Sequence, residues 1–148
     1  EEVKILFADM IATMKAKKGT GIAATQIGVG QRVIVYFISE ERATREGSQS
    51  IPITGIANPT FSPETDETEE DWEGCLSVPG MRGKVPRFTK IKYTGINIET
   101  GELIDGIASG FHARVLQHEI DHLDGVLYID KMTESQKTVQ NFIIFDSQ

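Results

Sequence analysis

The chain has 148 residues, 39% of them hydrophobic and 25% charged, which is enough for one substantial core, and we predict a single domain over residues 1–148. Fifteen Lys and Arg against 22 Asp and Glu give a net charge of -7, which opposes direct nucleic-acid binding. The sequence contains no apolar run of ~18 residues, so it does not predict a membrane span. The single cysteine, Cys75, excludes an internal disulfide framework and indicates a reducing compartment. Because the chain begins with Glu1 rather than Met, we expect its natural start to lie upstream.

The first third of the chain has one helical and two extended patterns. Apolar residues at three- and four-residue steps predict an N-terminal helix, which Gly19 and Gly21 are expected to end: Val3, Leu6, Phe7, Met10, Ile11 and Met14. Residues 32–38 are β-branched and aromatic and predict a strand, and residues 53–61 predict a second strand limited by Pro59. The polar residues 39–50 between them are predicted to form a loop.

The middle of the chain indicates more strands. Residues 62–71 are acidic and rich in turn formers. Residues 91–98 and 103–107 have strand patterns, and residues 99–102 (Glu-Thr-Gly-Glu) suit a hairpin connection between them.

The last third is predicted to contain two helices. Residues 111–123 have helical spacing that stops before Gly125, and residues 126–129 are apolar enough for one more strand. Thr133 with Gln136 resembles a capping box and predicts a final helix. The expected fold class is α+β, a mainly antiparallel β-sheet packed with an N-terminal helix, a central helix and a short C-terminal helix.

The predicted central helix carries the segment His118-Glu119-Ile120-Asp121-His122. Residues four apart lie one above the other on a helix, so both imidazoles can reach one metal ion, with Glu119 beside it. A metal ion lowers the pKa of water toward neutrality, and a neighbouring carboxylate can take the proton and return it to a leaving amine. Taken alone, the pattern also suits two helix histidines that are hydrogen-bonded elsewhere.

A catalytic metal site needs three protein ligands and one open position, so the third ligand decides the class of enzyme. Gly125 matches the glycine of the longer metalloprotease pattern, but Tyr128 stands where the third histidine would be. Other metalloproteases use a glutamate on a downstream helix as the third ligand, but the sole glutamate after His122 is Glu134, which lies close to a turn. A Cys75 thiolate would bind iron or zinc well, and Gly74 permits close approach of the backbone. The alternative is that Cys75 is a small buried hydrophobic residue.

Three segments together resemble the peptide deformylase family. Residues 19–26 (GTGIAATQ) resemble G-x-G-x-A-A-x-Q, residues 73–77 (EGCLS) resemble E-G-C-x-S, and residues 118–122 (HEIDH) resemble H-E-x-D-H. Their order and spacing are also similar to those of the family, and the resemblance extends from the first helix to about Met132. On these motifs the chain is identified as a member of the peptide deformylase family.

The resemblance implies a metal-dependent hydrolase that removes the formyl group from N-formylmethionine at the amino terminus of newly synthesised polypeptides and releases formate. It implies that Cys75, His118 and His122 bind one divalent metal ion per chain. Fe(II) is the expected native ion, and zinc, nickel or cobalt also accept this ligand set.

The resemblance also implies how the reacting groups are handled. Glu119 is the implied general acid/base, and Gln26 and the backbone N–H of Leu76 are the implied donors to the oxyanion. A neutral amide donor suits that role, and its loss typically costs about 100- to 1,000-fold in rate. The alternative for Gln26 is an amide that caps a loop.

A recess for the methionine side chain is implied around the metal, with these substrate-binding residues: Thr20, Gly21, Ile22, Glu73, Gly74, Arg82, Phe111, Arg114 and Val115. Three of these residues precede His118 by seven, four and three positions: Phe111, Arg114 and Val115. They therefore lie on or near the helical face that carries His118. We expect the aliphatic stem of Arg114 to line the recess and its charged head to reach solvent. Phe111 and Val115 also suit ordinary core positions.

Charged residues near the motifs are expected to support the metal site. Glu73 resembles a family carboxylate that orients a metal-bound imidazole, and Arg87 and Asp121 are candidates for the same network. A solvated surface charge is the alternative for all three. For Gly19 and Gly21, the alternative to bordering the substrate is simply ending the first helix.

The expected partners are formyl-methionyl nascent peptides, with the ribosome near its exit site as a further partner, in a bacterial-type cytoplasm or with a phage or organellar origin. The chain departs from the family in lacking the segment that usually precedes the first helix and in having a tail that is not strongly basic. Two rivals remain: a metal endopeptidase, which Tyr128 disfavours, and a binding module without turnover, which Glu119 and Gln26 disfavour.

Overall fold

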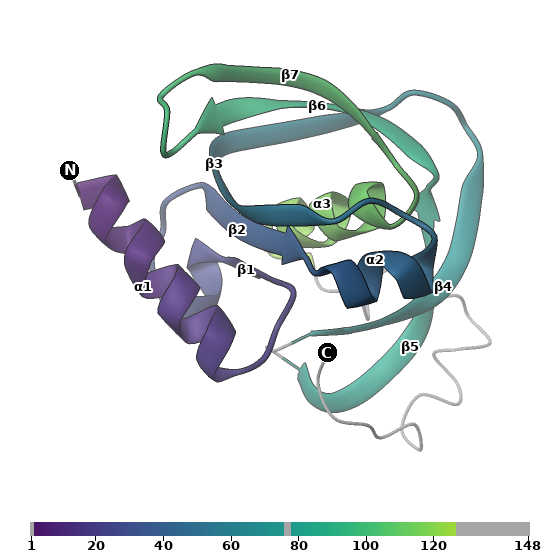
Figure 1. Cartoon of the computed structure of the whole chain (residues 1–148), viewed down its shortest axis with the longest axis horizontal. Coiled ribbons are helices and arrows are strands. Elements are labelled where there is room, and N and C mark those ends of the chain that lie inside the picture. Colours follow the sequence, from purple (N-terminus) through teal and green to yellow (C-terminus); the bar gives the residue numbers. More distant parts are fainter. Residues whose placement is uncertain (1, 76–77, 127–148) are drawn as a thin grey trace.

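The computed structural model describes residues 2–75 and 78–126. In this part of the chain, a curved antiparallel sheet of order β1-β2-β3-β6-β7 surrounds one face of helix α3, and a separate β4–β5 hairpin lies on the other side (Figure 1). The sheet strands are β1 (Gly21–Ala23), β2 (Val33–Ile38), β3 (Ile51–Pro63), β6 (Lys90–Asn97) and β7 (Leu103–Ser109). The other elements are α1 (Glu2–Ala16), a 3-10 turn η1 (Ala24–Ile27), α2 (Glu40–Glu46), β4 (Thr68–Cys75), β5 (Val78–Phe88) and α3 (Gly110–Leu123). This arrangement confirms the α+β fold class.

Helix α3 is the central element, and ten consecutive residues of it, 113–122, are buried. Ala113, Leu116 and Ile120 form a core cluster with sheet residues, among them Ile34, Tyr36, Ile56 and Ile91. A helix enclosed on all sides must satisfy every polar side chain that it carries. The polar half of α3 therefore needs partners from the β4–β5 hairpin.

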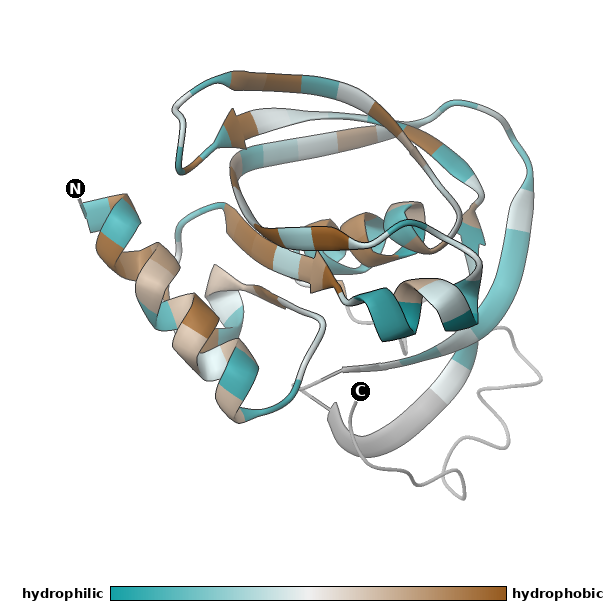
Figure 2. Ribbon diagram, viewed as in Figure 1, coloured by the Kyte–Doolittle hydropathy of each residue, from teal (hydrophilic) through white to brown (hydrophobic). Residues whose placement is uncertain are grey.

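Strand β2 is buried on both faces, which explains its uninterrupted apolar sequence (Figure 2). Ile34 and Tyr36 face α3, whereas Val33 and Val35 lie in a second core cluster beneath α1, as the two-residue period of a strand requires. The prediction of a strand over residues 32–38 is confirmed.

The predicted N-terminal helix is confirmed as α1, which buries Leu6, Met10 and Met14 against the sheet. Its end differs from the expectation, because α1 stops at Ala16 and Lys18 adopts a left-handed conformation (φ 59°). The N–H of Gly19 donates to the carbonyl of Met14 at 3.0 Å, so Gly19 belongs to the terminating turn. Gly21 lies in β1 instead.

The prediction of a loop over residues 39–50 is wrong for its first half, which forms helix α2. The Ser39 hydroxyl accepts a hydrogen bond from the N–H of Arg42 at 3.1 Å and caps the helix, and Arg42 pairs with Glu46 one turn later. Gly47 ends the helix in the left-handed conformation. The polar composition of residues 39–50 therefore led to a loop prediction although a capped helix forms there.

The expected limit of the second strand at Pro59 is also wrong. Strand β3 continues to Pro63 because an irregularity between Ala57 and Thr60, with Asn58 at φ 53°, accommodates the proline, which lacks an N–H for the ladder. The acidic stretch of residues 62–71 is largely extended, since β4 already begins at Thr68. Strand β5 was not predicted.

Strand β1 was not predicted either, whereas strands β6 and β7 and the central helix agree with the sequence-based expectations. Strands β6 and β7 pair in register as a hairpin, and the Asn97 side chain accepts from the N–H groups of Glu99 and Thr100 in its turn. Residues 111–123 are helical as predicted. The predicted final helix and the strand expected after Val126 lie outside the described residues. No described helix combines the length and apolar character needed to cross a membrane.

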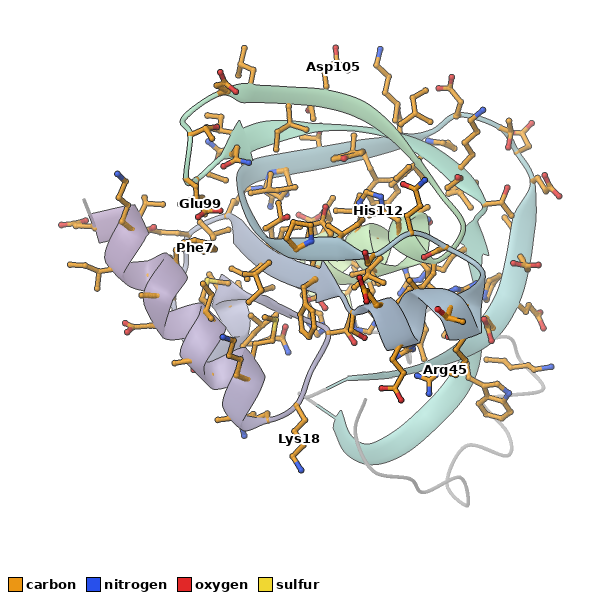
Figure 3. The ribbon with its side chains drawn as sticks, viewed as in Figure 1. Phe7, Lys18, Arg45, Glu99, Asp105 and His112 are labelled. Carbon is orange, nitrogen blue, oxygen red and sulfur yellow. The ribbon has the colours of Figure 1, made fainter. Side chains whose placement is uncertain are left out.

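His112, in the first turn of α3, lies inside the curve of the sheet (Figure 3). Its Nε2 is 2.9 Å from the hydroxyl of Tyr36 on β2, and the Tyr93 ring on β6 packs edge-on with centroids 5.7 Å apart. Burial lowers the pKa of His112 to about 4. The ring is therefore neutral at neutral pH.

This burial predicts acid sensitivity of the fold. Unfolded His112 binds a proton near its ordinary pKa of 6.5, whereas the folded protein binds it only near pH 4. The unfolded state thus holds more protons in that window, and the free energy of unfolding should fall as pH drops through it. His112→Asn should reduce this slope, as measured by urea unfolding at several pH values. Identical slopes in the variant and the wild type would contradict the assignment.

Candidate active site

The two motif histidines lie on one face of α3, because they are four residues apart on a regular helix. The ring centroids of His118 and His122 are 5.0 Å apart, with an angle of 62° between the ring planes. Both side chains are buried, together with Glu119 between them. The expectation that the helix brings the two imidazoles together is confirmed.

A buried carboxylate orients the first imidazole. Nδ1 of His118 lies 2.8 Å from Oε1 of Glu73 on strand β4, and the Glu73 side chain is only 4% exposed. An ionised carboxylate can only accept, so Nδ1 carries the proton and Nε2 keeps its lone pair. The ring is thereby fixed in the tautomer that a metal ion binds through Nε2.

Two arginines hold this carboxylate in its charged form. Arg87 donates to both oxygens of Glu73 at 2.9 Å, and Arg114 donates to Oε2 at 2.6 Å. Burial raises the pKa of Glu73, but the hydrogen bonds from His118 and Arg87 and the charge of Arg87 outweigh it and hold this pKa well below its usual range. Glu73 is therefore an anion at neutral pH.

Asp121 completes the network on α3. Its Oδ2 accepts from Arg87 at 2.5 Å, and the residue is 8% exposed. The alternative of a solvated surface charge is therefore excluded for Glu73, Arg87 and Asp121, all of which are buried. The network links β4, β5 and α3 directly behind the imidazoles.

The charged head of Arg114 does not reach solvent, contrary to the expectation. Besides Glu73, it donates to the backbone carbonyls of Val85 at 2.9 Å and Glu69 at 2.6 Å. Three acceptors, two of them buried and one partly buried, satisfy the end of the guanidinium. Arg114 does line the recess described below, as predicted.

The second imidazole is also in the form that binds metal ions. Burial, followed by the charges of His118 and Arg87, lowers the pKa of His122 to about 3, so the ring is neutral at physiological pH. The Thr25 hydroxyl donates to the His122 carbonyl at 3.2 Å and ties η1 to the end of α3. The loop that precedes β2 is thus fastened to the motif helix.

Glu119 lies in a tight, buried position. It is 3% exposed, its Oε1 has no hydrogen-bond partner among the described residues, and burial raises its pKa to about 7. A Cβ atom added to Gly21 would lie 2.7 Å from Oε2 of Glu119. Gly21 is therefore the residue whose lack of a side chain leaves room for this carboxylate.

The donor set suits a divalent metal ion. Two neighbouring imidazoles and a buried carboxylate lie on this helix, although no group of three His, Cys, Asp or Glu side chains forms a metal site within residues 2–74 and 83–126. A third ligand must then come from outside those side chains. Cys75 ends β4 two residues after Glu73, and its side chain lies outside the described part.

Gln26 closes the η1 turn. Its Oε1 accepts from the N–H of Ala23 at 2.8 Å, as in the loop-capping alternative. This bond uses the acceptor end of the amide and fixes its orientation, while the oxyanion role needs its donor end. The two roles are therefore compatible. Leu76, the other implied donor, lies outside the described residues.

A small recess opens beside the motif helix. Its lining is Thr20, Arg42, Trp72, Glu73, Phe111, Arg114, Val115, His118 and Glu119. Thr20, Phe111 and Val115 were predicted there, whereas Arg42 and Trp72 were missed. Ile22 lies instead in the core cluster beneath α1, and the backbone of Gly74 pairs with Arg82, whose side chain is not described.

A helix that presents two neighbouring imidazoles, one of them oriented by a buried carboxylate, and a buried glutamate beside an apolar recess is typical of hydrolases of the H-E-x-x-H class. Residues 1–138 match the family model described as "Polypeptide deformylase". The chain belongs to the peptide deformylase family, whose members are metal-dependent hydrolases that remove the formyl group from N-formylmethionine on new polypeptides.

Named relatives agree with this family. "Peptide deformylase 1" of Nitrosomonas europaea is 44% identical over 147 residues, which cover 99% of this chain and 82% of the relative. "Peptide deformylase 2" of Ralstonia nicotianae is 49% identical over 127 residues, which cover 86% of this chain and 71% of the relative.

Solved structures agree as well. A class I type b peptide deformylase from Acinetobacter baumannii superposes with a TM-score of 0.79 at 32% identity, covering 89% of this chain and 82% of that one. A Plasmodium falciparum peptide deformylase superposes with a TM-score of 0.78 at 32% identity, covering 93% of this chain and 79% of that one. The fold and the enzyme family expected from the three sequence motifs are confirmed.

The contact between Gly21 and Glu119 makes a specific prediction. Gly21→Ala should push the Glu119 carboxylate aside and lower kcat by about 10- to 100-fold, because a displacement of about 1 Å in an active site can cost that much. Metal content should stay near the wild-type value, since neither residue is an implied ligand. Gly30→Ala, where the added methyl group meets nothing within 4 Å, is the matched control. Wild-type turnover in Gly21→Ala would contradict the placement.

Proposed function

We propose that this chain hydrolyses the bond between the formyl carbon and the amino nitrogen of N-formylmethionyl peptides, with one divalent metal ion held by Cys75, His118 and His122. The observation that carries the proposal is the pair of neighbouring imidazoles on α3, one of them oriented by the buried Glu73 anion, with Glu119 buried on the same helix. When bound, the ion supplies Lewis acidity that makes water nucleophilic near neutral pH.

Glu119 handles the protons of the reaction in this proposal. Its carboxylate accepts a proton from the attacking water as oxygen adds to the formyl carbon, and it returns that proton to the amine nitrogen as the carbon–nitrogen bond breaks. The products are formate and a free amino terminus. The buried position of Glu119, beside Gly21, supports this role because few other groups compete for the carboxylate.

Gln26 and the backbone N–H of Leu76 are proposed to stabilise the negative charge that develops on the formyl oxygen. Support comes from the bond between Gln26 Oε1 and Ala23, which fixes the amide before substrate arrives. Donors that are already oriented cost no reorganisation during the reaction. The Thr25 contact with α3 holds this turn beside the histidines.

The substrate side chain is proposed to enter the recess beside α3, whose walls are formed by Phe111, Val115 and the stem of Arg114. An unbranched, flexible apolar chain such as methionine suits this shape. Thr20, Gly21, Ile22, Glu73, Gly74 and Arg82 are proposed to border the peptide.

Fe(II) is the proposed native ion, with zinc, nickel and cobalt as functional substitutes, since imidazole and thiolate ligands accept all four. The proposed setting is a bacterial-type cytoplasm, where formyl-methionyl chains leave the ribosome.

A direct assay of the proposed function mixes anaerobically purified protein with formyl-Met and acetyl-Met peptides and follows the release of free amine and formate. Formyl-Met peptide should be hydrolysed and acetyl-Met peptide should not. Cleavage of an internal peptide bond, with the formyl group untouched, would overturn the proposal in favour of an endopeptidase.

The role of Glu119 predicts a specific outcome for Glu119→Gln, which keeps the side-chain shape but cannot take and return a proton. The deformylation rate should fall by roughly 100- to 10,000-fold, while metal content and melting temperature stay near wild type. Cys75→Ala is the contrasting variant and should lose the metal instead. A folded, metal-loaded Glu119→Gln protein with wild-type turnover would refute the mechanism.

A further inference from the structure

Helix α2, which was not predicted from the sequence, brings a cation to the substrate recess. The guanidinium carbon of Arg42 lies 4.5 Å from the centroid of the Phe111 ring, within the range of a cation–π contact. Nε of Arg42 also pairs with Glu46 at 3.1 Å, and its side chain is 16% exposed. Arg42 is thus a largely covered residue with two defined contacts, and it lines the recess.

The position of Arg42 along the recess follows from α3. Phe111, Val115 and His118 all line it, and a helix rises about 1.5 Å per residue, so Phe111 lies roughly 10 Å from His118 along the axis. Arg42 packs on Phe111, at the end away from the imidazoles. A side chain that enters beside His118 therefore meets the Arg42–Phe111 pair last.

We propose that Arg42 is a specificity-determining residue that forms the end wall of this recess and limits the length of the first side chain of the substrate. The inference rests on the proposed function and goes beyond it by naming the residue that sets the length limit. It concerns an α2 residue that lies outside the three motifs of the family.

Glu46 acts as a positioning residue in this arrangement. Its carboxylate holds Nε of Arg42 one helical turn away, which keeps the guanidinium plane over the Phe111 ring. Glu46 itself does not line the recess beside His118. Its removal should loosen the wall without adding space beside Phe111.

The length limit is measured with straight-chain substrates. Formyl-norleucine peptide, which matches methionine in length, is compared with formyl peptides whose first side chain is one and two methylene groups longer. Arg42→Ala should raise kcat/KM for the longest substrate relative to formyl-norleucine by about 10-fold, the scale on which apolar pockets discriminate single methylene groups. Arg42→Lys and Glu46→Gln should change the same ratio in the same direction by about threefold.

Arg45→Ala is the matched control, because Arg45 lies on the same helix, is exposed and does not line the recess (Figure 3). Its ratio should stay within about twofold of wild type. Equal ratios in Arg42→Ala and Arg45→Ala would overturn the inference while leaving the proposed function intact. If Arg42→Ala does not fold, an unchanged ratio in Arg42→Lys overturns it equally. A wild-type protein that hydrolyses no formyl peptide would overturn the proposed function, and this inference with it.

Discussion

The buried charge of Glu73 is the constraint on which the rest of the site depends. A carboxylate that is 4% exposed is costly to ionise unless strong donors surround it, and Arg87, Arg114 and His118 provide them from β5 and α3. In return, the anion fixes the tautomer of His118 and docks the β4–β5 hairpin on the motif helix. One residue therefore joins folding and chemistry, since the elements that satisfy its charge are those that carry the candidate metal ligands.

The same constraint explains why α3 can be buried on all sides. The sheet covers its apolar face, while the polar face, with Arg114, His118 and Asp121, meets Glu73 and Arg87 instead of water. Glu119 is the exception, with one oxygen that has no partner among the described residues. Polar groups left unsatisfied inside a fully packed core are typical of functional sites. The residues that hold α3 in place are thus distinct from Glu119, the proposed acid/base.

Sequence reasoning reached the site through local spacing and missed what depends on distant contacts. The helical period found α1 and α3, and three short motifs found the family. Helix α2 had readable signals, Ser39 before it and Gly47 after it, which the polar composition obscured. Strands β4 and β5 pair with each other and carry charged and glycine residues, so they lack the hydrophobic alternation from which a strand is predicted. The buried head of Arg114 and the place of Arg42 on Phe111 follow from tertiary contacts that no local pattern encodes.

The most direct test of the central claim is metal affinity measured together with the free energy of unfolding in Glu73→Gln. The variant keeps the shape of the side chain but removes its charge, so His118 loses its anionic acceptor and the two arginines lose their counterion. Metal affinity should fall by about 10- to 100-fold, and the unfolding free energy of the metal-free protein should fall by about 3–5 kcal/mol. Glu70→Gln, an exposed change on the same strand, should alter neither. Wild-type metal affinity and stability in Glu73→Gln would contradict the account.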